Sequence, residues 1–283
     1  MATALTIKTA LNYGIGVLSL SSESPKVDTE VLLCEVLQCN RSKLIIDPEQ
    51  SLSDSQITRF LAFIEQRKLG HPVSYIIGHQ DFWTLSLEVN ESTLIPRPET
   101  ELLVELAVSL PVPANSHCLD LGTGTGAIAL AIASEKSDWQ VLGCDRVADA
   151  VALAQRNKRR NNITNVAFIE SHWFNQLPEQ KFDVIVTNPP YVESNSDYLN
   201  RGDLRFEPQS ALVAGGDGLD DIRQIIAMAS DYLNPQGWLL IEHGFEQSKS
   251  IQSLLVAQGF NKVTTKLDYA GHDRVTMAQF GVA

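Results

Sequence analysis

The chain has 283 residues, with 34 acidic and 22 basic side chains, a formal net charge of −12 and a pI near 4.9. This acidity disfavours proteins that bind phosphate backbones, because their non-specific nucleic-acid affinity comes mainly from Lys and Arg. A hydrophobic content of 44%, with 17 Gly and 12 Pro, is typical of a globular protein and excludes a disordered or collagen-like chain. The length allows one large domain or two ordinary ones, since single cores stop growing at about 250–300 residues, and we expect two.

Membrane, secretion and metal signals are weak in this sequence. The longest aliphatic stretch, Ala127 to Ala133, is far shorter than the roughly 20 residues of a membrane-spanning helix. The first residues lack the basic start, apolar block and cleavage site of a secretory signal, so we expect a cytoplasmic protein with no membrane partner. The four cysteines form no C-x-x-C pair, which predicts reduced thiols and no metal site.

The first 75 residues have a helical pattern. Ser24 and Pro25 have the form of an N-cap followed by proline at the first helical position. Ser53 and Gln56 have the spacing of a capping box, and apolar residues follow at helical spacing. We therefore predict a small helical bundle over residues 1–75.

The pattern changes to strand-like alternation at residues 76–95, which predicts a β-hairpin linking two domains. From residue 96 to 283, apolar strands alternate with helical stretches. This alternation predicts an α/β domain with a mostly parallel sheet covered by helices on both faces, closed by an antiparallel hairpin. The predicted strands are Cys118 to Leu121, Val141 to Cys144, Val166 to Ile169, Phe182 to Thr187, Trp238 to Glu242, Val263 to Leu267 and Val275 to Phe280.

A glycine-rich turn follows the first of these strands. It consists of Gly122, Thr123, Gly124, Thr125 and Gly126. Glycines here let a ligand approach the backbone and the amides at the start of the next helix. The alternating spacing differs from the G-x-G-x-x-G of a dinucleotide site. From this motif alone, a turn that merely closes a βα unit stays open as an alternative.

Two further residues extend the predicted nucleoside site. Asp145 ends the second strand about 20 residues beyond the glycines, where an acid can accept both ribose hydroxyls. An exposed helix-capping Asp is the alternative. Trp173 lies just past the third strand, where its ring plane is placed to flank an adenine. Core packing is the alternative for this tryptophan.

The most informative motif is the tetrapeptide Asn188-Pro189-Pro190-Tyr191, at the carboxyl end of the fourth strand. Two prolines fix the backbone and remove two N–H donors, so carbonyl oxygens are left to face the site. Asn188 adds a side-chain oxygen and Tyr191 adds a flat ring. Together they form an acceptor-rich clamp for a planar NH₂ group, which favours a ligand-binding role over a plain Pro-Pro turn.

These motifs together resemble a class I S-adenosylmethionine-dependent methyltransferase that acts on an amide or amino nitrogen. Over essentially the whole chain, the sequence resembles the peptide chain release factor N5-glutamine methyltransferase family (PrmC/HemK). The further segments that carry this resemblance are Ile95-Pro96-Arg97-Pro98-Glu99-Thr100-Glu101, Phe206-Glu207-Pro208 and Ile241-Glu242-His243-Gly244.

The resemblance implies a seven-stranded Rossmann-like methyltransferase domain over residues 96–283 and a role for the bundle in substrate recognition. It implies S-adenosyl-L-methionine as the cofactor, with S-adenosyl-L-homocysteine as its product. The implied substrate is the glutamine of the Gly-Gly-Gln motif in class 1 release factors, a modification that supports translation termination.

Within that reaction we expect Asn188, Pro189 and Tyr191 to be catalytic, with Pro190 completing the substrate site. The five-residue glycine turn, Asp145, Trp173 and Asn188 are the expected cofactor residues. Arg97, Glu99 and Thr100 either fix the methionine end of the cofactor or form an ordinary helix start. Glu242 and His243 are interpreted as structural, and no general base is assigned.

Four other functions stay open as alternatives. A glutamine methyltransferase for a ribosomal protein shares the tetrapeptide, and an amino-group methyltransferase for DNA or RNA uses similar chemistry but is disfavoured by the charge of −12. The intact tetrapeptide argues against a non-enzymatic nucleoside-binding module, and the glycine spacing against an NAD-dependent oxidoreductase. We expect a monomer that makes no direct contact with nucleic acid.

Overall fold

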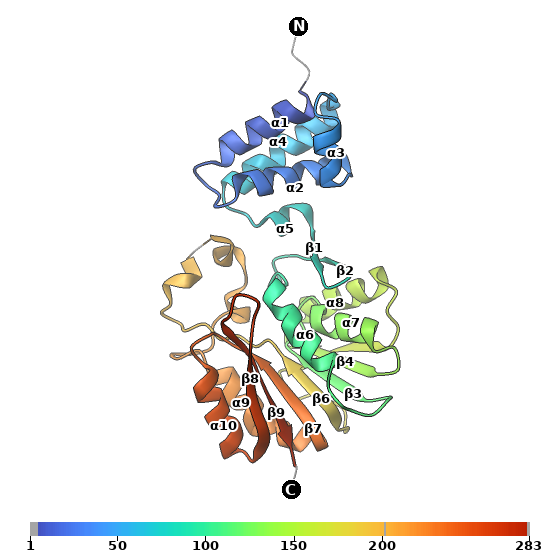
Figure 1. The fold of residues 1–283 in the computed structure, drawn as a ribbon, viewed down its shortest axis with the longest axis vertical. Helices are drawn as coiled ribbons and strands as arrows, with labels where there is room; N and C mark the ends of the chain where they lie inside the picture. The colour runs from blue at the N-terminus through green and yellow to red at the C-terminus, as the bar shows by residue number, and fades with distance from the viewer. Residues whose placement is uncertain (1–4, 201, 282–283) are drawn as a thin grey trace. The chain divides into compact units, whose positions relative to one another are not determined.

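The computed structural model describes residues 5–200 and 202–281, which divide into two compact units (Figure 1). The smaller unit contains residues 5–78 together with 202–206, and the larger contains 79–200 and 207–281. In the described residues, no helix combines the length and the apolar character needed to cross a membrane.

The smaller unit is a helical bundle around one apolar core. Its helices are α1 (Ile7–Leu18), α2 (Pro25–Leu37), α3 (Arg41–Ile46), α4 (Asp54–Lys68) and α5 (Val73–Ile77). The short 3₁₀ helix η3 (Gly202–Phe206) belongs to the same unit. The capping box predicted at the start of α4 is confirmed, since the side chains of Ser53 and Gln56 each bond to the other's backbone N–H. Phe60 and Ile64 of α4 are fully buried against residues of α1 and α2.

Arg67 of α4 joins η3 to the bundle. Its guanidinium donates to Asp28 Oδ2 at 2.6 Å, to Asp203 Oδ1 at 2.8 Å and to the main-chain oxygen of His71 at 3.0 Å. Phe206 packs on the His71 ring, with 4.5 Å between the ring centroids. A segment that follows the Asn188 tetrapeptide in the chain thus belongs to the helical unit.

The larger unit begins with the hairpin β1 (His79–Phe82) and β2 (Leu85–Glu88), inside the range predicted for it. Its main sheet has seven strands in the order β5-β4-β3-β6-β7-β9-β8. The strands are β3 (His117–Leu121), β4 (Gln140–Asp145), β5 (Val166–Glu170), β6 (Phe182–Thr187), β7 (Leu233–Glu242), β8 (Phe260–Leu267) and β9 (Asp273–Phe280). The first five of these pair in parallel, and β9 pairs antiparallel with both β7 and β8.

Helices cover both faces of this sheet (Figure 1). One face is covered by α6 (Glu101–Val108), α7 (Ala127–Glu135) and α8 (Ala148–Arg160). The other face is covered by α9 (Asp220–Tyr232) and α10 (Ser248–Ala257). The 3₁₀ turn η1 (Pro98–Thr100) precedes α6. Alternation along β6 explains this arrangement, because Val184 and Val186 pack on the first face and Ile185 packs on the second. Two further 3₁₀ turns, η2 (Asp197–Asn200) and η4 (Gln209–Ala211), follow β6.

The predicted α/β class, the mostly parallel sheet and the closing antiparallel hairpin are confirmed. Two strands, β7 and β8, begin well before their apolar runs. β7 begins at Leu233 because that residue already pairs with Phe182, and β8 begins at Phe260, which pairs with Phe280. The register shifts between each early start and the apolar run, and the residues between them are polar, Pro or Gly, so the sequence pattern does not show these strand starts.

Candidate active site

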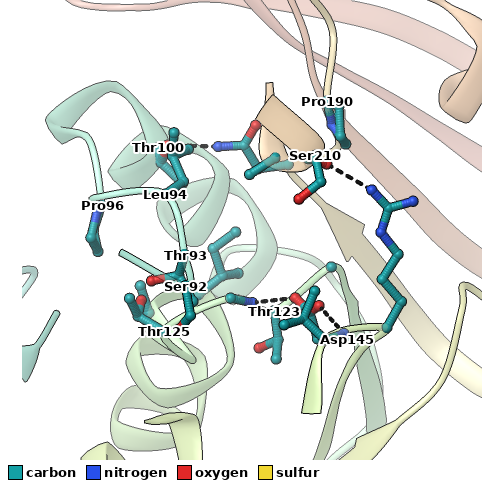
Figure 2. Close-up of a pocket in the computed structure, with 18 of the residues that line it drawn as sticks. Ser92, Thr93, Leu94, Pro96, Thr100, Thr123, Thr125, Asp145, Pro190 and Ser210 are labelled. Carbon is teal, nitrogen blue, oxygen red and sulfur yellow. Dashed lines mark hydrogen bonds between the residues drawn. The ribbon is translucent and has the colours of Figure 1, made fainter. Parts of the chain in front are cut away.

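A pocket lies at the carboxyl ends of the parallel strands, the usual ligand position in an open α/β sheet (Figure 2). It holds about 900 Å³ of free space, including the part open to solvent. Its lining includes Gly122, Thr123, Gly124, Thr125, Asp145, Trp173, Asn188 and Pro190. Three predicted residues, Gly126, Pro189 and Tyr191, lie outside this lining.

The glycine turn connects β3 to α7, and its three glycines have different surroundings. All three have positive φ, which favours glycine. A side chain at Gly122 would lie 3.3 Å from the Trp173 ring, whereas one at Gly124 would meet nothing closer than Thr93 at 3.8 Å. A side chain at Gly126 would lie 3.0 Å from the Phe168 ring. Gly122 and Gly124 therefore open the pocket, while Gly126 lets the turn pack on the domain core.

Asn157 of α8 also holds the glycine turn in place. The sequence pattern did not identify this residue. It is fully buried, and its Nδ2 donates to the main-chain oxygens of Thr125 at 2.9 Å and of Glu88 at 3.0 Å. Its Oδ1 accepts from the N–H of Glu88 at 2.6 Å. One side chain thus holds the glycine turn against the hairpin strand β2.

Asp145 ends β4 and lines the pocket beside the glycine turn. Its Oδ2 accepts from the N–H of Gly124 at 3.0 Å, and its Oδ1 accepts from the N–H of Val147 at 2.9 Å (Figure 2). Burial raises the pKa of this carboxyl above its ordinary value, against the opposing effect of these hydrogen bonds. Each carboxylate oxygen keeps a further lone pair, so the pair fits the two hydroxyls of a ribose.

Trp173 closes one wall of the pocket after β5. Its Nε1 donates to Asp221 Oδ1 at 3.2 Å, and its φ of 49° is a left-handed conformation. The main-chain oxygen accepts from Ser171 Oγ at 2.8 Å, which stabilises this turn. Trp173 also packs with the core on the α9 face. The sequence analysis gave core packing and a pocket position as alternatives, and Trp173 occupies both.

The Asn188 tetrapeptide follows β6 at the centre of the strand ends. Asn188 is half-buried and its Nδ2 donates to Thr100 Oγ1 at 3.2 Å (Figure 2). Pro189 is buried, and the main-chain oxygen of Tyr191 accepts from Gln247 Nε2 at 3.0 Å. Burial, reinforced by the nearby Glu242 carboxyl, raises the pKa of the Tyr191 phenol above its ordinary value, so Tyr191 stays neutral.

The segment before α6 supplies some of the residues that line the pocket. Arg97 and Thr100 line the pocket, whereas Glu99 does not. Arg97 Nη2 donates to Oε1 of the buried Glu207 at 2.5 Å. This pair joins two of the segments that carry the family resemblance.

Glu242 is the last residue of β7, and His243 follows it at the carboxyl end of the strand. His243 is buried and neutral, since burial lowers its pKa, and its Nε2 lies 2.7 Å from Thr276 Oγ1. Burial raises the pKa of the Glu242 carboxyl to about 7, although hydrogen bonds from the hydroxyls of Thr100 and Tyr191 oppose this rise. Its Oε2 has no hydrogen-bond partner among the described residues.

Several lining residues carry no signal in the sequence. They come from segments that only the fold brings together: Ser92, Thr93, Leu94, Arg146, Ser210 and Ala211. Arg146 Nη2 donates to the main-chain oxygen of Ser210 at 3.0 Å (Figure 2). Isolated polar residues in loops have no periodicity, so spacing alone does not identify them.

The fold and the pocket define a class I methyltransferase. Residues 98–217 match the family model described as "Methyltransferase small domain", and residues 9–78 match "PrmC N-terminal domain". A solved methyltransferase from Pyrococcus furiosus has the same fold, with a TM-score of 0.54 at 19% identity, over 81% of this chain and 100% of that one.

Curated relatives then give the family. The release factor glutamine methyltransferase of Shewanella oneidensis is 46% identical over 280 residues, covering 99% of this chain and 98% of that protein. The protein of the same name from Pseudomonas aeruginosa is 51% identical over 259 residues, covering 92% and 94%. The chain therefore belongs to the release factor glutamine methyltransferase family, and the predicted family and fold are confirmed.

Proposed function

We propose that this chain transfers a methyl group from S-adenosylmethionine to the side-chain amide nitrogen of the glutamine in the Gly-Gly-Gln motif of class 1 release factors. The names of the relatives support this substrate. The observation that carries the proposal is Asn188, which lines the pocket at the end of β6 with its Nδ2 already engaged. Release factors work on the ribosome, so we propose a cytoplasmic reaction.

The pocket residues fit the proposed cofactor. Asp145 would accept the ribose hydroxyls, and Trp173 would flank the adenine. Gly122 and Gly124 leave the backbone open to close approach by a ligand. When bound, S-adenosylmethionine would supply an electrophilic methyl group.

An amide is a weak nucleophile, and residues of this chain would compensate for that weakness. Its nitrogen lone pair is delocalised into the carbonyl, so reaction requires positioning and stabilisation of the positive charge that develops on nitrogen. Asn188 Oδ1 and the main-chain oxygen of Pro189 would accept the two N–H hydrogens of the glutamine amide. Tyr191 would hold the amide plane, and the proton released after methylation would pass to water.

The test is methyl incorporation from labelled S-adenosylmethionine. The protein is incubated separately with release factor, a ribosomal protein, DNA and RNA, and a release factor with Gln→Ala in its Gly-Gly-Gln motif serves as the substrate control. We expect label only in the unaltered release factor. Label in another acceptor instead would refute the proposed substrate.

The role of Asn188 is tested by Asn188→Ala. Loss of a preorganised acceptor should lower the methylation rate by about 10²-fold or more while cofactor binding persists. The matched control is Asn175→Ala, at an exposed asparagine outside the pocket lining. A rate near wild type for Asn188→Ala would remove the proposed role.

We also propose that the helical unit recognises the release factor. Its support is the set of large exposed apolar side chains that this unit carries, notably Leu20, Ile45, Ile46 and Leu69, which are 98%, 77%, 71% and 68% exposed. Single substitutions of these residues by Glu should weaken release-factor binding, measured by calorimetry, without changing cofactor affinity. Unchanged binding in all four variants would contradict this role.

A further inference from the structure

One part of the pocket wall is a short segment, residues 207–211, which we call the strap. It contains the 3₁₀ turn η4, and Ser210 and Ala211 of this turn line the pocket. Arg146, which directly follows Asp145 at the end of β4, also lines the pocket. Its Nη2 donates to the main-chain oxygen of Ser210 at 3.0 Å (Figure 2). This bond joins the strap to the strand that carries the proposed ribose contact.

Both ends of the strap are fixed. At its start, the fully buried side chain of Glu207 accepts from Arg97 Nη2 at 2.5 Å. Just beyond its end, the main-chain oxygen of Leu212 accepts from the N–H of Val192 at 2.8 Å, and the N–H of Leu212 donates to the main-chain oxygen of Gln209 at 3.0 Å. The strap is therefore held at both ends, and Arg146 is attached to the turn between them.

The bond between Arg146 and Ser210 lies where the pocket meets solvent. Among the residues that line the pocket, these two are exposed, whereas the others are buried or half-buried. Water competes for both groups, so this bond opens far more easily than the ion pair between Arg97 and the buried Glu207. A long, flexible side chain therefore lies across the pocket opening and is held there by an exposed hydrogen bond.

We propose that Arg146 gates the pocket. With its guanidinium on Ser210, the side chain closes the opening, and the ligand enters and leaves when this bond opens. The inference rests on the proposed function for the identity of that ligand, the cofactor and its product, but not for the position of the gate. Because both bonded groups belong to the protein, the bond forms whether or not the ligand is present, and it slows entry and release alike.

The first test measures the binding kinetics of S-adenosylhomocysteine by stopped flow with tryptophan fluorescence, since Trp173 lines the pocket. This ligand has no net charge at neutral pH, so loss of an arginine changes its electrostatic steering little. A hydrogen bond of this kind shifts an equilibrium by a few-fold to about tenfold. Arg146→Met should therefore raise both the association and the dissociation rate constants about threefold or more, with Kd changed less than about twofold.

Two control variants separate the gate from other effects. Ser210→Ala keeps the main-chain oxygen that Arg146 binds, so both rate constants should stay within about twofold of the wild type. Arg160→Met removes an exposed cation at the end of α8, outside the pocket lining, and should likewise leave both unchanged.

Two outcomes for Arg146→Met would overturn the gate. If the dissociation rate alone rises and Kd weakens by the same factor, Arg146 is a direct contact of the ligand. If neither rate constant changes, the bond to Ser210 does not limit access.

Access to the pocket is also measurable without a cofactor. The neutral nitroxide TEMPO quenches tryptophan fluorescence, and the contribution of Trp173, which is 7% exposed, is the part lost in Trp173→Phe. Quenching of this part should rise about twofold or more in Arg146→Met and stay unchanged in Ser210→Ala. Equal quenching in the wild type and Arg146→Met would overturn the gate. If these quenching results hold but the wild type neither binds S-adenosylhomocysteine nor methylates release factor, the proposed function alone is refuted.

Discussion

Replacing Asn157 by Ala tests how the glycine turn is held. The change removes three hydrogen bonds and leaves the N–H and C=O of Glu88 and the C=O of Thr125 without a side-chain partner. An orphaned buried polar group costs about 1–3 kcal/mol, and Glu88 is half-buried, so water relieves part of this cost. We expect the free energy of unfolding to fall by about 3–5 kcal/mol.

The assay is urea unfolding followed by circular dichroism and analysed by linear extrapolation, with Asn175→Ala as the control at an exposed asparagine. The control should change stability by less than about 0.5 kcal/mol. Because Thr125 belongs to the glycine turn, calorimetry should also show weaker S-adenosylmethionine binding by Asn157→Ala. A stability loss below about 1 kcal/mol with an unchanged denaturant slope would show that the bonds to Asn157 do not hold the turn.

Three other perturbations address charged groups. Asp145→Ala should weaken S-adenosylmethionine binding by about tenfold or more, because it removes the acceptors for two ribose hydroxyls, and an unchanged dissociation constant by calorimetry would argue against that contact. The folded-state pKa of Glu242, about 7, exceeds the ordinary value of 4.5, so folding favours the protonated form. Its contribution to stability is therefore complete below about pH 4.5 and is lost as pH rises to about 7, by up to about 3 kcal/mol; Glu242→Gln should show a correspondingly smaller fall in urea titrations over this range. Arg67→Met leaves Asp28 buried without its cation, and circular dichroism should report a loss of about 3–5 kcal/mol from the helical unit.

The fold was largely predictable because its signals are local. The continuous apolar run of β6 and the glycine turn after β3 identify a buried parallel strand and a crossover without knowledge of the rest of the chain. The placement of η3 in the helical unit was not predictable. It depends on an ion pair between Arg67 and Asp203, which are 136 residues apart, and sequence periodicity carries no information about such a pair.

Sequence periodicity also fails to predict the contacts of single residues in the site. Gly124 and Gly126 occupy equivalent places in one repeating motif, yet only Gly124 lines the pocket, because the core side chain of Phe168 lies against Gly126. Thr100 lies in a segment that the sequence associates with the family, but its hydrogen bond from Asn188 joins residues 88 positions apart and depends on the tertiary fold. Residue type predicted the acceptor clamp, whereas tertiary contacts determine which atom of Asn188 is free to accept.

Charged side chains of both signs line the pocket. Asp145 is its acid, and burial raises the pKa of this carboxyl above the ordinary value. Of its two arginines, Arg97 is paired with Glu207, and Arg146 donates to the main-chain oxygen of Ser210. The charge of the lining therefore does not distinguish a dinucleotide from another nucleoside ligand, and the spacing of the glycines is the feature that does.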